Sequence, residues 1–403
     1  MNLIRRWLDD AKAQPGLKYV ETCDGLRTMA VLIVAWFHIW QQSWLFPGVT
    51  LFGREISLDP LVRSGYIWVD MMILISGSCL YLPWARMRSE GGTPPHPVDF
   101  YVRRFVRIHP SYLLTLAIMF AVAMATNAYY TTGHMRRDLL SHLTYTHMFF
   151  YDAYYSSNLG GALWTLAIEM QFYLLFPLLA RVFYKLPATT FAAMVAAAIG
   201  FRGWIGANVA DVSMYFNQLP AYLDTFALGM MAAHVHAWLA GKKHNALTRI
   251  LCSCLCIAVL SLLWQVVRRQ AGNPDVLSIR VGQMNNRLSM GLLGAVFLVA
   301  SANAGLVLRR ILGNPMTKRF SAISFQFYIW HQTIAVWLVT YKVIPSAYEY
   351  PNYDGDAVWQ LWYTIAAFGI SILVAAALTY GFEHPVAKRL QNAWNRRRQK
   401  GKA

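Results

Sequence analysis

Long apolar blocks separated by short polar breaks dominate the pattern of this chain of 403 residues. A helix that spans a bilayer needs about 20 mostly apolar residues, and about ten blocks reach that length. Membrane barrels show short alternating segments instead. The pattern therefore predicts an all-α fold, a polytopic membrane bundle of about ten transmembrane helices. The blocks lie near residues 26–46, 64–84, 108–126, 161–183, 187–206, 218–240, 248–267, 288–308, 321–341 and 358–381.

The composition supports a membrane protein and excludes several other classes. Hydrophobic residues make up 57% of the chain and charged residues only 14%, whereas soluble domains carry about 25% charged residues. These values exclude intrinsic disorder, a coiled coil and a disulfide scaffold. We expect a cytoplasmic N-terminal segment at 1–25, a membrane domain at 26–382 and a basic cytoplasmic tail at 383–403.

The net charge of +17 informs topology. Membrane proteins concentrate Lys and Arg in cytoplasmic loops. With ten spans both termini lie on the same side of the membrane, and the segments on that side hold most of the basic residues. We therefore predict cytoplasmic termini, with membrane lipids rather than nucleic acid as surface partners. One outside loop runs against this trend, and its charges either meet an anionic acceptor or have no role. It contains Arg268, Arg269, Arg280 and Arg287.

The first span carries two ionisable residues, Arg27 and His38. An ionisable group in the bilayer core costs about 2.5–3.5 kcal/mol, so it usually faces the protein interior and has a role. The two residues are about three helical turns apart, which puts them on nearly the same face and roughly 16 Å apart along the axis. Histidine is the commonest general base near neutral pH. The competing interpretation of His38 is a hydrogen-bonded histidine between helices.

Further ionisable residues lie in later spans. Glu169 lies in an aromatic helix and needs a partner, which a protonated histidine or an arginine would supply. Asp70, Asp224 and His331 are candidates for a chemical role. Each of them can equally be a polar group that holds helices together.

Three arginines precede the third span, at Arg103, Arg104 and Arg107. A spacing of three residues puts Arg104 and Arg107 on one helical face. Two guanidinium groups on one face suit phosphate oxygens, although ordinary anchoring on the cytoplasmic side would give the same composition. We expect no metal site, because the cysteines at 252, 254 and 256 point to different sides of a helix.

Six short motifs, taken in order, give the chain a resemblance to acyltransferase family 3, a family of integral-membrane O-acyltransferases. The resemblance covers nearly the whole chain. Two positions depart from the family pattern, where Met71-Met72 replaces paired phenylalanines and Thr165 replaces serine. The matching residues are Asp24-Gly25-Leu26-Arg27 with His38, Asp70 with Ser76-Gly77, Arg104 with Arg107, Trp164 through Glu169 to Tyr173, Tyr328 with His331, and Glu383 with Pro385.

The resemblance implies a donor, an acceptor and a location. The donor would be acetyl-CoA or another acyl-CoA from the cytoplasm, and the acceptor a hydroxyl of an extracytoplasmic glycan. The protein would lie in a bacterial cytoplasmic membrane, with 26–382 as its acyltransferase domain. Family members often carry a further soluble domain that passes the acyl group on. This chain ends soon after its last span, so we expect the membrane domain to acylate its acceptor directly.

The resemblance also implies roles for the polar residues. Arg104 and Arg107, with Arg103 beside them, would hold the phosphates of the donor. His38 would act as general base or carry the acyl group briefly, and Glu169 would orient its imidazole. Arg27 would stabilise developing negative charge or guide the donor. His331 is the second candidate for the catalytic histidine.

Other functions remain open at this point. A secondary transporter of a small anionic or sugar substrate would also place charged groups near the membrane centre. A structural or sensor protein would tolerate the loss of His38. An acyltransferase could instead act on a lipid or antibiotic acceptor.

Overall fold

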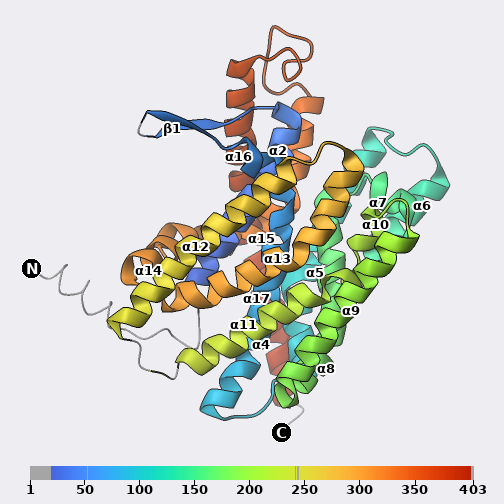
Figure 1. Ribbon diagram of the computed structural model, residues 1–403. Coiled ribbons are helices and arrows are strands. Elements are labelled where there is room, and N and C mark those ends of the chain that lie inside the picture. Colours follow the sequence, from blue (N-terminus) through green and yellow to red (C-terminus); the bar gives the residue numbers. More distant parts are fainter. Residues whose placement is uncertain (1–19, 52, 241, 243–244, 401–403) are drawn as a thin grey trace, which may run out of the picture.

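The chain folds into a bundle of long helices in the computed structural model, which describes residues 20–51, 53–240, 242 and 245–400 (Figure 1). Each predicted apolar block falls on one long helix, so the all-α prediction is confirmed. These helices are α2 (Thr22–Ser43), α4 (Val69–Glu90), α5 (Pro97–Ala125), α8 (Trp164–Lys185), α9 (Pro187–Asn208), α11 (Leu223–Ala240), α12 (Ala246–Ala271), α13 (Val276–Asn303), α15 (Pro315–Thr340) and α16 (Ala357–Leu378).

Fewer of these helices meet the criteria for a membrane span than the sequence pattern predicted. Within the described residues, 7 helices are long and apolar enough to cross a membrane alone. The count rises to 8 if the bent pair Val276–Asn303 and Leu306–Thr340, with an angle of 118° between its parts, is one span. Helices α11, α13 and α15 fall short individually because they carry polar and charged side chains. The figure of about ten spans is therefore approximate.

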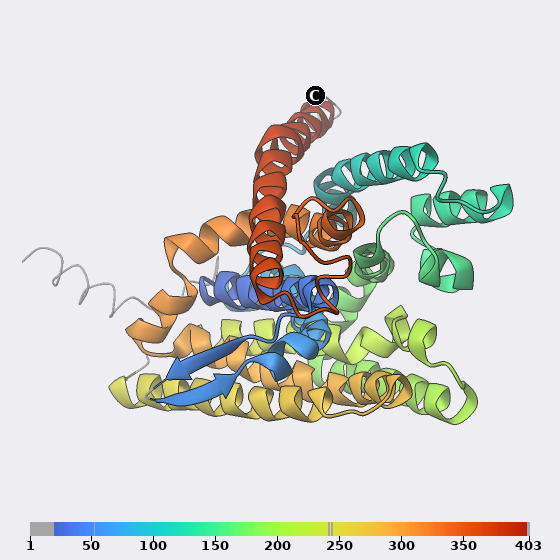
Figure 2. The same cartoon turned by 90° about the horizontal axis from the view of Figure 1, so that it is seen from above.

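Short elements connect the long helices. An antiparallel hairpin of β1 (Gly48–Leu51) and β2 (Arg54–Ser57) pairs Gly48 with Ser57 and Leu51 with Arg54, and it projects from one side of the bundle (Figure 2). The other connecting elements are α3 (Asp59–Arg63), η1 (Gly65–Trp68), α6 (Thr132–Leu143), η2 (His147–Phe149), α7 (Tyr151–Tyr155), η3 (Gly161–Leu163), α10 (Ser213–Phe216), η4 (Leu219–Tyr222), α14 (Leu306–Leu312), η5 (Thr379–Glu383) and α17 (His384–Lys400).

Helix α5 begins well before the predicted span. Pro97 occupies its first turn, where a missing N–H costs nothing, and the His96 side chain accepts a hydrogen bond from the Val98 N–H at 3.3 Å. The arginines at 103, 104 and 107 are therefore helical and continuous with the membrane-embedded part of α5. This rigid connection fixes the direction in which their side chains point.

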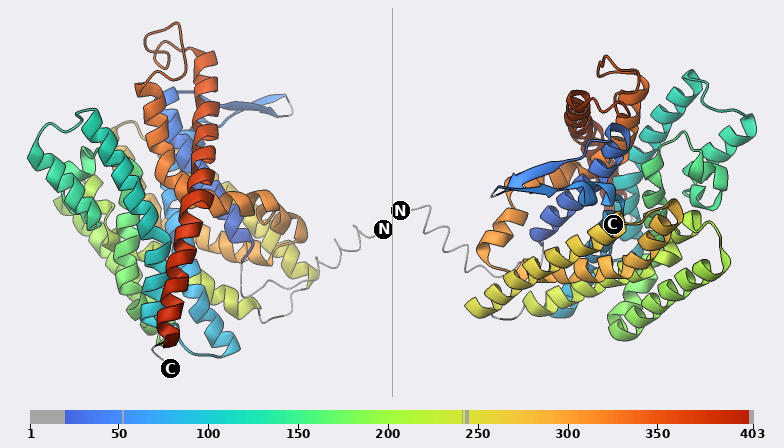
Figure 3. Two further views of the ribbon diagram at one scale, coloured as in Figure 1. Left: turned by 180° about the vertical axis from the view of Figure 1, so that it is seen from behind. Right: turned by 45° about the horizontal axis from the view of Figure 1, so that its top comes forward.

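The last helices form one continuous rod. Helix α16 passes through the π-helical turn η5 into α17, so the helix runs without a break across residues 382 and 383. Figure 3 shows this rod along the back of the bundle. Its end docks on the start of α5, where Asp99 pairs with Arg398 and accepts a hydrogen bond from Trp394 at 3.4 Å.

Both described ends of the chain lie at the same end of the bundle. Lys318, near the start of α15, pairs with Glu21 at 3.1 Å. Arg398 pairs with Asp99, near the start of α5. Helices α5 and α15 both begin at this end, and the hairpin and the segment from α6 to α7 lie at the opposite end (Figure 1).

Two motif glycines allow close helix packing. A Cβ at Gly25 would lie 2.4 Å from the carbonyl oxygen of Leu312, and a Cβ at Gly77 would lie 2.6 Å from that of Phe226. Real Cβ atoms do not approach backbone so closely, so only glycine permits these contacts. Gly25 brings α2 against the end of α14, two residues before Arg27. The packing therefore helps to position that arginine.

Candidate active site

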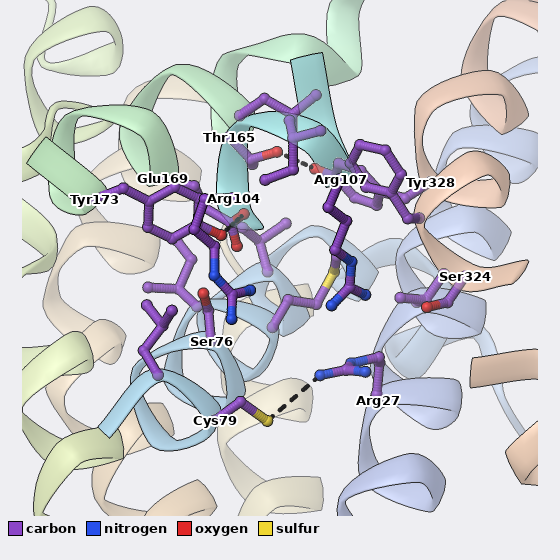
Figure 4. A pocket seen from close by; sticks show the side chains of 18 residues that line it. Arg27, Ser76, Cys79, Arg104, Arg107, Thr165, Glu169, Tyr173, Ser324 and Tyr328 are labelled. Atoms are coloured by element: carbon purple, nitrogen blue, oxygen red, sulfur yellow. Dashed lines mark hydrogen bonds between the residues drawn. The ribbon is translucent and has the colours of Figure 1, made fainter. Parts of the chain in front are cut away.

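A cavity of about 270 Å³ with a polar, charged lining lies between the five helices α2, α4, α5, α8 and α15. Its charged lining residues are Arg27, Arg104, Arg107 and Glu169, and their side chains converge in Figure 4. We refer to it as the arginine cavity. Its remaining polar lining residues carry hydroxyl, phenol or thiol groups, and they are Ser76, Cys79, Thr165, Tyr173, Ser324 and Tyr328.

Arg27 reaches into the cavity from α2. One terminal nitrogen, Nη1, donates to Ser321 Oγ at 3.4 Å, and Nη2 donates to Cys79 Sγ at 3.6 Å. The Cys79 thiol also lies close to the Cys23 thiol. Cys23 lies on α2 and Cys79 on α4. The structure brings them together beside Arg27.

Arg104 and Arg107 enter the cavity from the same face of α5, as their spacing predicted. The Arg104 guanidinium lies over two aromatic rings, 5.8 Å from the centre of Phe100 and 5.9 Å from that of Tyr173. Its Nε is buried and has no hydrogen-bond partner among the described residues. Arg103 is exposed and is not among the residues that line the cavity.

Glu169 supplies the negative charge of the cavity. Its Oε2 accepts a hydrogen bond from the Tyr173 hydroxyl at 2.9 Å, and Ser76 lies close to the same carboxylate. The carboxylate also faces the arginines across the cavity (Figure 4). An arginine was one of the two kinds of partner that the sequence allowed for Glu169. Three guanidinium groups face one carboxylate, so the lining has a surplus of positive charge. A surplus of positive charge of this kind attracts anions.

The two candidate histidines lie beside each other. The ring centres of His38 on α2 and His331 on α15 are 5.2 Å apart. His38 Nδ1 pairs with Gln41 Oε1 at 3.1 Å, and His331 Nδ1 lies 2.8 Å from the Tyr328 carbonyl oxygen. An Nδ1 that donates to an oxygen leaves Nε2 as the basic nitrogen. Gln41 thus takes the orienting position that we expected of Glu169.

Tyr328 connects the histidines to the arginine cavity. Its side chain lines the cavity, and its ring centre is 5.6 Å from that of His331. Thr165 Oγ1 donates to the Tyr328 hydroxyl at 3.1 Å (Figure 4). The threonine that departs from the family pattern thus keeps a hydroxyl in this contact. The histidine pair therefore lies about one helical turn beyond the end of the cavity.

Asp70 and Asp224 belong to a separate set of buried ion pairs. Arg287 Nε lies 3.3 Å from Asp70 Oδ1, and Arg202 Nη2 lies 2.5 Å from Asp224 Oδ2. Arg202 also donates to the Ala221 carbonyl oxygen at 2.7 Å. All four charged groups are buried and paired. This geometry favours the interpretation of both aspartates as groups that hold helices together.

The placement of Arg287 in an outside loop was wrong. Helix α13 begins at Val276, where Asp275 caps it by accepting from the Ser278 N–H at 2.9 Å. Arg287 consequently lies about three turns into this helix, and it is fully buried. The cap signal at Asp275 could have revealed the earlier start, but the apolar window began only near residue 288. The proposed contact between Arg287 and an anionic acceptor is therefore excluded by burial.

An apolar helical bundle with an internal polar cavity defines an integral membrane protein, and the convergence of acid, base and guanidinium groups is typical of an enzyme. The chain belongs to acyltransferase family 3, because the family model described as "Acyltransferase domain" matches residues 21–380. Membership of this family favours an acyltransferase over the secondary-transporter alternative.

The curated relatives include proteins named as O-acetyltransferases and a nodulation protein. The chain is 27% identical over 183 residues to the peptidoglycan O-acetyltransferase of Listeria monocytogenes, which covers 42% of the chain and 25% of that protein. It is 26% identical over 207 residues to nodulation protein 10 of Rhizobium leguminosarum bv. viciae, covering 48% and 53%. A putative O-acetyltransferase of Staphylococcus aureus is 22% identical over 353 residues, covering 81% and 52%.

The matches leave part of each relative uncovered. The matched region spans between 25% and 53% of the length of these relatives. No solved structure matches the chain. Within the described residues, no group of three or more His, Cys, Asp or Glu side chains could hold a metal ion.

Proposed function

We propose that the protein moves an acyl group, most simply acetyl, from acyl-CoA to a hydroxyl group of an extracytoplasmic glycan. The observation that carries this proposal is the arginine cavity with its surplus positive charge, because the cavity ends about one helical turn from the pair His38 and His331. An anionic donor and a basic group for a hydroxyl acceptor are the two requirements of this reaction.

The donor would bind through its phosphates. Arg104 and Arg107 present two guanidinium groups from one helix face, and such groups bind phosphate oxygens through paired hydrogen bonds. Pockets for drug-sized ligands measure about 300–1,000 Å³, so a cavity of about 270 Å³ holds only part of the larger coenzyme. We infer that the narrow pantetheine arm enters the cavity and that the nucleotide stays at its mouth.

The chemistry would occur at the histidines. Nε2 of His38 would remove the proton of the acceptor hydroxyl while that oxygen attacks the thioester carbonyl. The new C–O bond forms as the C–S bond breaks, and the proton passes to the departing CoA thiolate. A variant of this route forms an acyl-histidine first, by attack of Nε2 on the same carbonyl. Arg27, roughly 16 Å from His38 along α2, guides the donor rather than taking part in bond making.

The orientation follows from the donor. Acyl-CoA is a cytoplasmic metabolite, so the end of the bundle with Arg104 and Arg107 would face the cytoplasm. Glu21 and Arg398 lie at that same end through their ion pairs, so both termini would be cytoplasmic. Basic residues at this end are also what the positive-inside rule favours. We propose the cytoplasmic membrane of a bacterium as the location, in keeping with the curated relatives.

The proposal is tested with purified protein in nanodiscs. Acetyl-CoA labelled in its acetyl group is supplied together with glycans extracted from the cell envelope, and label transfer is followed by mass spectrometry. We expect binding of CoA and transfer of one acetyl mass to a glycan hydroxyl. If the protein neither binds CoA nor cleaves the thioester, the proposed function is wrong. If the label appears on a lipid or an antibiotic instead, only the acceptor class is wrong.

A further inference from the structure

A second cavity, of about 560 Å³, lies at the opposite end of the bundle from the arginines. It is bounded by the ends of α5 and α15 and by the segment that leads into η3, near α6 and α7 in Figure 1. None of the described residues that line it carries a formal charge. Its polar and aromatic lining residues are Thr126, Ser157, Asn158, Gln332, Thr333, Trp337, Thr340 and Tyr341.

The two cavities lie end to end along the same helices. On α15, Tyr328 lines the arginine cavity and Gln332, one turn later, lines the second cavity. Thr165, at the start of α8, lines the arginine cavity, and Gly161, four residues earlier in η3, lines the second cavity. His331 lies between Tyr328 and Gln332 in the sequence, so the histidine pair lies at the level of α15 between the two cavities without being part of either lining.

The second cavity offers hydrogen-bond groups without a partner. Gln332 Oε1 is buried and accepts no hydrogen bond from the residues that the structure describes. A buried acceptor left unpaired costs about 1–3 kcal/mol, so a ligand hydroxyl at this position would be favourable. A Cβ at Gly161 would lie 2.9 Å from the same oxygen. The absence of a side chain at Gly161 therefore leaves room for the Gln332 amide at the cavity wall.

The wall opposite α15 is held in place by a buried carboxylate. Asp138 on α6 accepts hydrogen bonds from the Asn158 N–H at 3.1 Å and from the Tyr129 hydroxyl at 2.9 Å. It also pairs with His142 at 3.1 Å. Burial alone would raise the pKa of Asp138, but hydrogen bonds from His142, Ser157 and Asn158 outweigh it and lower the pKa. The anchor therefore stays ionised at neutral pH and keeps the cavity wall fixed.

We propose that this second cavity is the acceptor subsite and that it takes an uncharged saccharide unit. Amide and hydroxyl groups match sugar hydroxyls, and the Trp337 ring offers a flat apolar face for the C–H side of a sugar ring. A lining without cations gives no advantage to an anionic ligand, in contrast to the arginine cavity. The inference rests on the proposed function, because it identifies the acceptor of that same reaction.

The test separates acceptor binding from donor chemistry. Purified protein in nanodiscs receives acetyl-CoA at saturation and one of two neutral disaccharides, cellobiose or diacetylchitobiose, and sialyllactose serves as the anionic probe. Acetyl transfer gives the KM for each disaccharide. Cleavage of acetyl-CoA without acceptor and CoA affinity are measured in parallel. The variants are Gln332→Leu and Thr333→Val, which remove polar atoms at similar volume, and the matched control is Gln360→Leu on α16.

We expect Gln332→Leu to raise the KM for a neutral disaccharide roughly threefold to tenfold, in line with a hydrogen bond of about 0.5–1.5 kcal/mol. CoA affinity and thioester cleavage should not change, and Gln360→Leu should behave like the wild type. The subsite proposal is overturned if thioester cleavage is normal and both cavity variants keep the wild-type KM. It is also overturned if sialyllactose is the only probe acetylated, or if none is. If the wild-type protein neither binds CoA nor cleaves the thioester, the proposed function itself is overturned.

Discussion

Two groups of arginines inside the bundle have opposite surroundings. Arg202 and Arg287 are buried and each pairs with an aspartate. Arg27, Arg104 and Arg107 converge on one cavity that contains a single carboxylate. Because an unpaired charge in the membrane is costly, paired arginines indicate a structural role and surplus arginines indicate an anionic ligand. The role of a buried arginine therefore follows from the balance of charge around it rather than from the residue type.

The largest effect is expected when a paired arginine loses its charge. Arg287→Ala leaves Asp70 buried without its counter-ion, and breaking a buried pair costs about 3–5 kcal/mol. Thermal unfolding in detergent should show a strongly destabilised protein.

The matched control for this variant replaces both charges. Asp70→Leu combined with Arg287→Met removes the pair and fills its volume, a change that is often neutral. This double variant should unfold near the wild-type temperature. An Arg287→Ala protein as stable as the wild type would remove the distinction between the two groups.

The surplus arginines should affect donor binding instead of stability. Arg104→Ala should weaken CoA binding about 10-fold to 100-fold, because hydrogen bonds to charged groups contribute about 1.5–3 kcal/mol. Arg104→Lys should restore only part of the affinity, since an ammonium group lacks the paired geometry. Calorimetric titration with CoA measures both.

Arg103→Ala is the internal control for this series, because Arg103 is adjacent but lies outside the cavity lining. It should bind CoA like the wild type. Equal losses in Arg103→Ala and Arg104→Ala would mean that the arginines act only through general surface charge.

The smallest effect is expected at Glu169. Glu169→Gln removes the one negative charge that faces the three arginines and keeps an acceptor for Tyr173. A charge pair near 4 Å contributes about 1 kcal/mol in a water-like environment, so CoA should bind about fivefold more tightly. CoA affinity and the rate of acetyl transfer, measured on the same variant, distinguish two roles for Glu169. Tighter CoA binding with retained turnover fits a counter-charge, whereas lost turnover at unchanged affinity fits a catalytic acid or base.

The helices were predictable because apolar blocks of membrane length leave few alternatives. The family motifs also identified the residues that line the arginine cavity. Their contacts were not predictable, since a pattern along one chain does not tell which face meets which helix. Glu169 meets Tyr173 and the arginines, and Gln41, which no motif contained, meets His38.

Other features were missed because their signals are weak in a hydropathy window. The second cavity is built from glycines, amides and hydroxyls that are scattered over three segments. Arg287 lies in a helix whose first half is polar, so the window assigned it to a loop. The cap at Asp275 was the local signal that would have placed it in α13.

The claim that binding and chemistry are separated along α2 is tested most directly by His38→Ala, measured for CoA affinity and acetyl transfer in the same nanodisc preparation. We expect CoA affinity close to that of the wild type, because the surplus arginines are untouched, and transfer reduced by about 10²–10⁴-fold. His38→Gln should show the same loss while it keeps a polar group of similar size. Near-normal transfer by His38→Ala would show that His38 is not the general base and would move the chemistry to another residue, such as His331.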